Sequence, residues 1–232
     1  MKKEKTLYCE LAYVFGLILL AFGTSLMEKA DLGMSMVVAP AYLLHLKISQ
    51  FLPFFSFGMA GYVFQAILLT VLSIIMKKAK KIYFLSFATA FIYGLILDLM
   101  IALVSLFNLN GIVWQIVLYA LGLVICAIGI AFLFHTYFPP EAYDLFVKEL
   151  SAKTNISIGK IKTIYDFSSC ALSIILSLCF FGGFVGVKWG TIICALLNGL
   201  LIGLFNKFLD RSFTFKDALP LRDLLLDKPK QK

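Results

Sequence analysis

The stretch EKADLGMSMVVAP, residues 28–40, interrupts a chain that is otherwise close to continuous hydrocarbon. A second stretch, HTYFPPEAYDLF at residues 135–146, interrupts it again with acids and helix breakers. Such residues are costly inside a bilayer, because hydrocarbon offers no water to charged groups or to unpaired backbone. Two interruptions at matching places therefore predict a membrane protein built around two broken segments.

The composition predicts a bilayer environment. Hydrophobic residues make up 61% of the chain and charged residues 15%, whereas soluble domains average about 45–50% and about 25%. An apolar run of about 20 residues is long enough to cross the hydrocarbon core as a helix. Runs of about this length predict six transmembrane helices, at 9–27, 54–76, 83–107, 112–134, 164–183 and 187–208.

Two further apolar segments, 33–50 and 139–151, are too short or too interrupted to cross. We expect each to form a half-helix that enters the membrane and returns on the same side. The alternative is an amphipathic helix on the membrane surface, and the sequence leaves both interpretations open. Gly33 and the Pro139-Pro140 pair stand at the boundaries of these segments, where such residues commonly begin or end helices.

The two halves of the chain resemble each other. An offset of 106 residues places Gly16 on Gly122 and brings the two interruptions together. The same offset places Gly23 on Gly129. At an offset of 105, FIYGLI around Gly94 overlies LLNGLL around Gly199.

Each half then contains one span, one half-helix and two further spans. Because three crossings reverse the direction of entry, the halves are predicted to be inverted repeats, an arrangement that secondary transporters use. The fold class is thus an all-α polytopic membrane protein with six transmembrane helices and two half-helices. The predicted single integral membrane domain, 1–232, comprises a first repeat at 9–107, a second at 112–208 and a cytoplasmic tail at 209–232.

The basic residues predict the orientation. Of the 21 Lys and Arg residues, all except Lys29, Lys47 and Lys188 fall in the N-terminal segment, two alternate loops and the C-terminal tail. Cytoplasmic segments carry the excess of Lys and Arg, so both termini are predicted to be cytoplasmic. The net charge of +8 then reflects this topology and contact with anionic membrane lipids, and no nucleic-acid partner is expected.

Several stretches resemble a known family. PPEAYDLFVKELSAKTNISIGKIKTIYD and GGFVGVKWGTIICALLNGLLIGLF resemble the second-half pattern of the YczE/YyaS/YitT-type bacterial membrane proteins. FGTSLMEKADLGMS is similar to that family's first-half G-x-x-L-x-x-x-A-x-L-G signature. The chain departs from the pattern at Lys188-Trp189 and at Asn198-Gly199-Leu200, where a Gly-Pro is more usual. The resemblance covers residues 12–208 and implies a multi-pass protein of the bacterial inner membrane, but little mechanism.

Acids inside the apolar segments are the first candidates for a binding site, because a buried charge in a bilayer needs a partner, water or a function. Asp98 lies inside the predicted span 83–107; the alternative is that it is hydrated at the outer interface. Glu141 and Asp144 are three residues apart, which places them on one face of a helix in its first turn. The alternative for this pair is simple stabilisation of the helix N-terminus.

The predicted substrate-binding residues are Asp98, Glu141, Asp144, Ser35, Thr24 and Asn198. Asp166 is expected to pair with Lys162, one helical turn earlier, which leaves the candidate acids without a matching cation. Acids of this kind favour a cationic, protonatable or zwitterionic substrate over an anion.

Catalytic motifs are missing from the sequence: it contains no G-x-S-x-G, H-E-x-x-H or P-loop pattern. Its two histidines, His45 and His135, are too few for a histidine-based metal centre. The five cysteines form no C-x-x-C pair and act as small hydrophobes. We therefore expect no enzyme activity, no cofactor and no metal site.

The predicted function is a small secondary transporter or channel-like permease that takes a small-molecule or ion substrate. The alternative is a non-transporting membrane partner, such as a substrate-capture subunit of an energy-coupled importer or an assembly factor. A capture subunit must dock a motor on its cytoplasmic face, for which the loop KKAKK and the tail are available. A membrane-protein partner or a homo-oligomer is compatible with either function.

Overall fold

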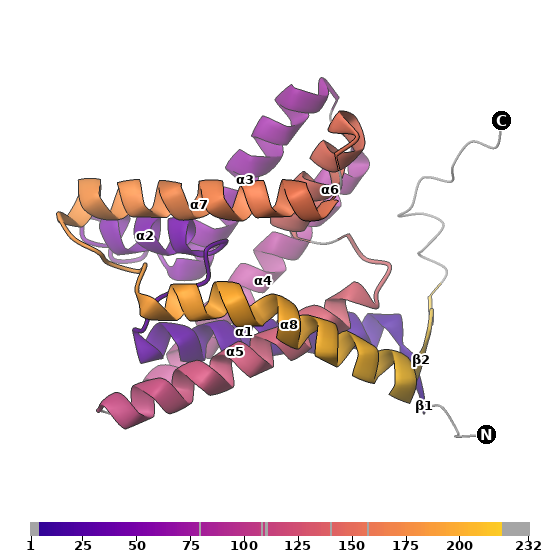
Figure 1. The fold of residues 1–232 in the computed structure, drawn as a ribbon, viewed down its shortest axis with the longest axis horizontal. Helices are drawn as coiled ribbons and strands as arrows, with labels where there is room; N and C mark the ends of the chain where they lie inside the picture. Colours follow the sequence, from indigo (N-terminus) through magenta and orange to yellow (C-terminus); the bar gives the residue numbers. More distant parts are fainter. Residues whose placement is uncertain are drawn as a thin grey trace.

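The computed structural model describes residues 5–78, 80–107, 109, 111–139, 141–156 and 158–219, and these are nearly all helical. Of the predicted tail, residues 220–232 lie outside the described part. The elements in chain order (Figure 1) are β1 (Lys5–Tyr8), α1 (Cys9–Ala30), α2 (Ala39–Ile48), α3 (Phe57–Met76), α4 (Lys81–Ser105), α5 (Ile112–Phe134), α6 (Ala142–Thr154), α7 (Ile158–Phe181), α8 (Trp189–Ser212) and β2 (Phe213–Lys216).

Six of these helices, α1, α3, α4, α5, α7 and α8, are long and apolar enough to cross a membrane. They confirm the six predicted spans, with ends shifted by a few residues. The shift is largest at α7, which begins at Ile158 although the apolar run begins at 164. Lysines in the first turns of a helix do not stop it, because their long side chains carry the charge to water. The chain thus has the pattern of a multi-pass membrane protein.

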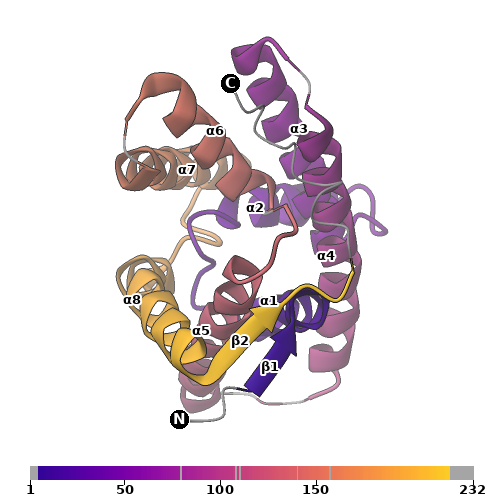
Figure 2. The same cartoon turned by 90° about the vertical axis from the view of Figure 1, so that its right-hand side faces the viewer.

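A small parallel sheet, which the sequence analysis did not anticipate, pairs the segment before α1 with the segment after α8. Lys5 of β1 lies opposite Phe213 of β2, and Tyr8 lies opposite Lys216. Figure 2 shows the two strands side by side at one end of the bundle, which we call the terminal end. Both strands therefore lie on the same side of the bundle, as six crossings require.

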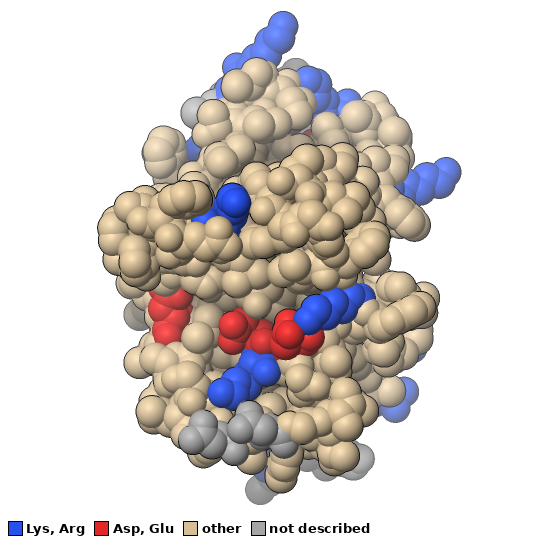
Figure 3. Space-filling view, turned by 90° about the vertical axis from the view of Figure 1, so that its left-hand side faces the viewer, with Lys and Arg blue, Asp and Glu red and all other residues tan. Residues whose placement is uncertain are grey.

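The opposite end of the bundle, which we call the far end, carries the connection after α1 and the connection between α7 and α8. Lys188, just before α8, pairs with Asp31, just after α1, at 2.7 Å. Figure 3 looks onto this end and shows acidic and basic side chains in a band between two largely uncharged masses.

Helices α1 and α5 cross at glycines that the sequence alignment had superposed. A methyl group on Gly23 would lie 2.7 Å from the Gly122 backbone oxygen, and one on Gly129 would lie 2.9 Å from that of Gly16. Glycine permits this close approach because it has no side chain to separate the backbones. The helix that opens each half therefore packs directly on its counterpart.

The short helix α2 begins at mid-depth and runs back to the far end. Ser169, near the middle of α7, donates a hydrogen bond to the Met36 carbonyl, which lies just before α2. Lys47, near the end of α2, donates to the Phe180 carbonyl at the far end of α7. With a rise of about 1.5 Å per residue, these two points on α7 are separated by roughly 16 Å.

The short helix α6 has the same layout from the other end. Gln65, in the middle of α3, accepts a hydrogen bond from the backbone N–H of Ala142, where α6 begins. Lys153, in the last turn of α6, donates to the Ile75 carbonyl, where α3 ends next to the terminal end. Both segments that were predicted as half-helices thus contain a short helix, α2 over 39–48 and α6 over 142–154.

The last two spans pack differently in the two halves. α3 and α4 form a tight hairpin in which a methyl group on Gly58 would collide with the backbone of Gly94. α7 instead packs on α2 and α6, while α8 packs on α5. Figure 1 shows α7 and α8 as two separate helices, one above the other, on the side of the bundle nearest the viewer.

Candidate functional site

The main cavity lies between α7 and α8 and extends inward to α1, α4 and α5. Its volume is about 830 Å³. Most of its wall is apolar, but five of the six residues predicted from the sequence line it: Thr24, Ser35, Glu141, Asp144 and Asn198. The structure thus brings together side chains from both halves of the chain.

Glu141 is positioned by Gln65, a buried amide of α3. The Gln65 side-chain NH₂ donates to Glu141 Oε2 at 3.3 Å, and its oxygen accepts from the N–H of Ala142 at 3.0 Å. The other carboxylate oxygen, Oε1, is buried without a hydrogen-bond partner. Burial raises the pKa of the Glu141 carboxyl to about 8; the neighbouring charge of Asp144 adds to this rise and the Gln65 hydrogen bond opposes it.

Titratable groups from several helices lie near the Glu141 carboxyl. These groups are Tyr13 of α1, Tyr93 of α4, Cys126 of α5 and Tyr143 of α6. The short helices α2 and α6 begin close to this point, since Ala41 of α2 and Tyr143 of α6 pack in one cluster with Phe64 of α3. The positive ends of both helix dipoles therefore lie near one another.

Asp144 forms an ion pair with Lys162, whose Nζ lies 3.5 Å from Asp144 Oδ1. This corrects the expectation that Lys162 pairs with Asp166 and that the candidate acids have no matching cation. Lys162 is one turn from Asp166 on α7, and it attracts that carboxylate electrostatically. Of these two acids, Asp144 of α6 is nevertheless the one whose carboxylate lies within ion-pair distance of Lys162. The packing of α6 on α7 decides this, and local sequence spacing does not show it.

Hydroxyl groups line the inner wall of the cavity. Thr24 Oγ1 lies 3.0 Å from the Tyr93 hydroxyl and donates to the Leu20 carbonyl at 2.8 Å. Ser35 lies in the segment before α2, and its carbonyl accepts hydrogen bonds from the N–H groups of Val38 and Ala39. Through these backbone bonds Ser35 helps to start α2, and Ser35 also lines the cavity.

Four acceptor oxygens in this cavity have no hydrogen-bond partner. They are Glu141 Oε1, Asp166 Oδ1, Asn198 Oδ1 and Asn206 Oδ1, all four buried. All four residues line the cavity. Within the described part of the chain, no other buried side-chain oxygen or nitrogen lacks a partner. The wall of the cavity therefore concentrates acceptors that have no donor within the described part of the protein.

Asp98, the sixth predicted residue, lies elsewhere. Its carboxylate accepts hydrogen bonds from the Ser56 hydroxyl and, at 2.7 Å, from the N–H of Gly58, so it holds the start of α3 against α4. Ser56 in turn caps α3 by accepting from Met59 N–H at 3.0 Å. Asp98 does not line the cavity. Its hydrogen bonds provide the partners that an acid within a span requires.

Several residues of the cavity were not identified from the sequence. Gln65 could have been noticed as a single amide within an apolar run, since a buried amide needs partners. Tyr93 could also have been noticed, because it lies near the centre of the predicted span 83–107, where a hydroxyl needs a hydrogen-bond partner. Lys162 and Asn206 lie near span ends, where polar residues are ordinary.

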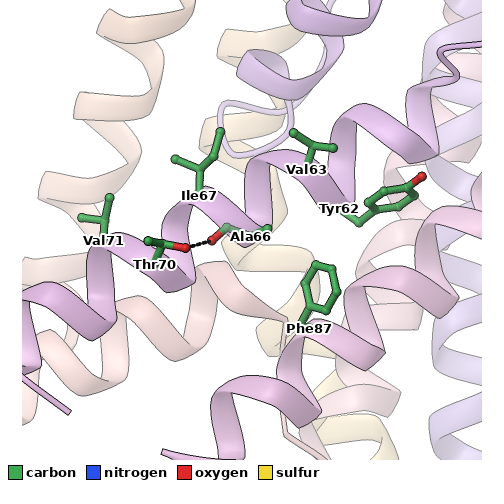
Figure 4. A pocket seen from close by; sticks show the side chains of 7 residues that line it. All are labelled: Tyr62, Val63, Ala66, Ile67, Thr70, Val71 and Phe87. Atoms are coloured by element: carbon green, nitrogen blue, oxygen red, sulfur yellow. Dashed lines mark hydrogen bonds between the residues drawn. The ribbon is translucent and has the colours of Figure 1, made fainter. Parts of the chain in front are cut away.

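A second hollow, of about 420 Å³, lies on the outer surface of α3. Figure 4 shows it lined mostly by apolar side chains, including Val63, Ile67 and Phe87. The Thr70 hydroxyl there already donates to the Ala66 carbonyl at 2.8 Å. This hollow offers contact area for hydrocarbon and lacks the unpaired acceptors of the main cavity.

Groups that could ligate a metal are dispersed in the described residues, which contain no cluster of three or more His, Cys, Asp or Glu side chains suited to an ion. His135, for example, bonds to the Ala131 carbonyl and to Asp210 at the terminal end. It also stacks on Phe215 of β2. Its contacts attach the end of α5 to the end of α8.

Comparison with known proteins identifies relatives over most of the chain. A family model described as a family of unknown function (DUF6198) matches residues 7–207. The uncharacterized protein YyaS of Bacillus subtilis (strain 168) is 28% identical over 209 residues, which cover 88% of this chain and 96% of YyaS. This confirms the resemblance to a YyaS-like family. No solved structure matches the chain.

Proposed function

This chain belongs to DUF6198, a family of unknown function, and from that premise we propose that it is a small secondary transporter or permease with its binding site in the main cavity. The charge distribution supports a location in the bacterial inner membrane with the terminal end in the cytoplasm. The proposed substrate is a small molecule that donates hydrogen bonds, and no chemical conversion is proposed.

The observation that carries the proposal is the set of four unpaired buried oxygens in one cavity. A buried polar group without a partner costs about 1–3 kcal/mol. Four such groups in one place are disfavoured in a cavity that serves packing alone. A bound polar molecule, or water that it displaces, supplies the missing donors. The cavity therefore has the character of a binding site that is emptied and filled.

The placement of α2 and α6 supports transport over static binding. Both short helices begin near the middle of the bundle and lead to opposite ends. Their N-termini approach the same region as the cavity. We interpret this as the predicted inverted repeat, whose pseudo-symmetry is also consistent with the crossed glycine contacts between α1 and α5. Transporters with this architecture expose a central site to each side in turn.

The test is access to Asn198 from the two sides of the membrane. A single Asn198→Cys substitution in a cysteine-free background is treated with a membrane-impermeant thiol reagent, in right-side-out and in inside-out vesicles. We expect labelling from both sides of the membrane. Conditions that raise the labelling rate from one side should lower the labelling rate from the other side. Gly61→Cys is the matched control, because Gly61 also faces open space on a span but does not line the cavity. It should label from neither side.

Access from one side in every condition would contradict transport and would fit a substrate-capture subunit. Absence of labelling from both sides would contradict a solvent-accessible binding site of any kind. These two outcomes separate the proposed function from its principal alternatives.

A further inference from the structure

We infer that the main cavity binds an amphipathic amine, with an ammonium head and a hydrocarbon body, which enters sideways between α7 and α8. This inference rests on the proposed function and adds the class of substrate and its route. Three features of the cavity carry it: the separation of charged from uncharged wall, the excess of acceptors, and the opening between two helices.

The charged residues of the cavity wall lie from its middle to its terminal end, whereas the uncharged polar residues Thr24, Ser35 and Asn198 lie along the rest of it. Asn206 lies in the last two turns of α8, and Asp166 lies in the first half of α7, both nearer to the terminal end. The opposite part of the cavity is lined by Met27, Met34 and Ile192, next to the far end. Along α8 the distance from Ile192 to Asn206 is roughly 21 Å at about 1.5 Å per residue. A ligand that matches this wall has one polar end and an extended apolar end.

The charges at the polar end favour a cation with hydrogen-bond donors. Among the described residues that line the cavity, the carboxylates are Glu141, Asp144 and Asp166, and the one basic residue is Lys162. Lys162 is already paired with Asp144. An anionic head would suit the two helix N-termini, but it has no donors for the four unpaired oxygens and would lie beside the Asp166 carboxylate. An ammonium group provides three donors, and its charge complements Asp166 and favours ionisation of Glu141, whose pKa is about 8.

The cavity opens to the outside between α7 and α8. Phe167 of α7 and Leu196 of α8 line the cavity, yet they are 69% and 68% exposed. A methyl group on Gly199 or Gly203 would meet no atom within 4 Å. Because α7 and α8 are apolar enough to cross a membrane, this opening faces hydrocarbon. A molecule with a hydrocarbon body can pass through it without leaving the bilayer.

Binding of decylamine to the full chain in phosphatidylcholine nanodiscs tests the inference. We expect saturable binding by isothermal calorimetry that neither methylamine nor decanoate reproduces, since the first lacks the apolar body and the second lacks the cation. Decyltrimethylammonium should bind at least about tenfold more weakly than decylamine, because it keeps the charge and loses the hydrogen-bond donors. Equal binding of decanoate and decylamine, or of methylamine and decylamine, would overturn the proposed substrate class.

Two substitutions connect the binding to the cavity. Glu141→Gln should weaken decylamine binding about tenfold or more. Glu149→Gln, on the same helix but paired with Lys80 outside the cavity, should leave it unchanged. Equal effects of the two would show that the amine binds elsewhere.

The route is tested independently by filling the opening. Gly199→Phe should slow decylamine binding about tenfold or more, because the new ring occupies the space between α7 and α8. Gly61→Phe, at a glycine with equally free space on α3, should not. Equal rates in both variants would overturn lateral entry. Partial replacement of phosphatidylcholine by phosphatidylethanolamine distinguishes the source of the amine, since competition indicates a lipid headgroup and its absence indicates a free amphiphile.

The outcomes are separable from those of the proposed function. If decylamine does not bind while Asn198→Cys is still labelled alternately from the two sides, the substrate class is wrong and transport stands. If labelling is also confined to one side, both are wrong.

Discussion

The hairpin of α3 and α4 and the pair of α7 and α8 occupy corresponding places in the two halves of the chain, but one pair is closed and the other is open. Gly94 of α4 lies against the backbone of Gly58. Gly199, which the sequence alignment superposes on Gly94, faces empty space. The same residue type thus serves close packing in one half and leaves an opening in the other. The comparison indicates a fixed wall on one side of the cavity and an open side on the other.

The largest expected effect comes from adding one methyl group to each pair. Gly58→Ala should lower the free energy of unfolding by about 3 kcal/mol, the upper range for overpacking, because the obstacle is backbone that cannot rotate away. Gly199→Ala should leave it unchanged or raise it by up to about 1 kcal/mol, because alanine favours the helix. Thermal unfolding in nanodiscs measures both. Similar losses in the two variants would show that α7 and α8 are as tightly packed as α3 and α4.

A smaller contrast is expected between two polar residues. Asp98→Ala removes acceptors from the Ser56 hydroxyl and the Gly58 N–H, and it should cost about 1–2 kcal/mol of stability. Asn198→Ala removes an acceptor that has no partner, so stability should remain within about 0.5 kcal/mol of the wild-type value or increase. Chemical denaturation of both variants measures this, and a larger loss for Asn198→Ala would argue against an unpaired Asn198.

The pH dependence of stability should report on Glu141, which lies between the spans α5 and α7. Its pKa is about 8 in the folded protein against an ordinary value of 4.5. Folding therefore takes up a proton between these values, and stability should fall as the pH rises from about 4.5 to about 8. Glu141→Gln should flatten this fall. The melting temperature, measured across this pH range, reports the difference, because each 1 kcal/mol of unfolding free energy shifts it by about 2–4 °C. An unchanged profile in the variant would assign the titration to another group.

Much of the fold could be predicted from the sequence because the bilayer imposes a simple rule. Six apolar runs became six long helices, and the two interrupted segments became α2 and α6. Hydropathy identifies such elements well, since every backbone group in hydrocarbon must be paired within its own helix. The pairing of β1 with β2 was missed because each strand has only four residues. The alternation in FTFK, residues 213–216, was the available signal.

The candidate site could be predicted in part. The reasoning that a polar residue in hydrocarbon needs a function placed Thr24, Glu141 and Asn198 among the candidates, and these do line one cavity. The same reasoning also selected Asp98, because burial costs a capping carboxylate as much as a binding carboxylate. The difference lies in Ser56, forty-two positions earlier in the chain. Which residue stands opposite on the next helix is a property of tertiary packing, and no local pattern records it.

The most direct test of the account is the distance between α7 and α8 in the membrane. Spin labels at Ile175 and Leu200 report on this open pair, and labels at Ile74 and Phe84 report on the closed pair of α3 and α4; all four positions are exposed. Pulsed electron–electron double resonance in nanodiscs gives the distribution of each distance. We predict one narrow distance between α3 and α4, and two populations between α7 and α8, as expected for a binding site that opens and closes. A single narrow distance for both pairs would contradict it.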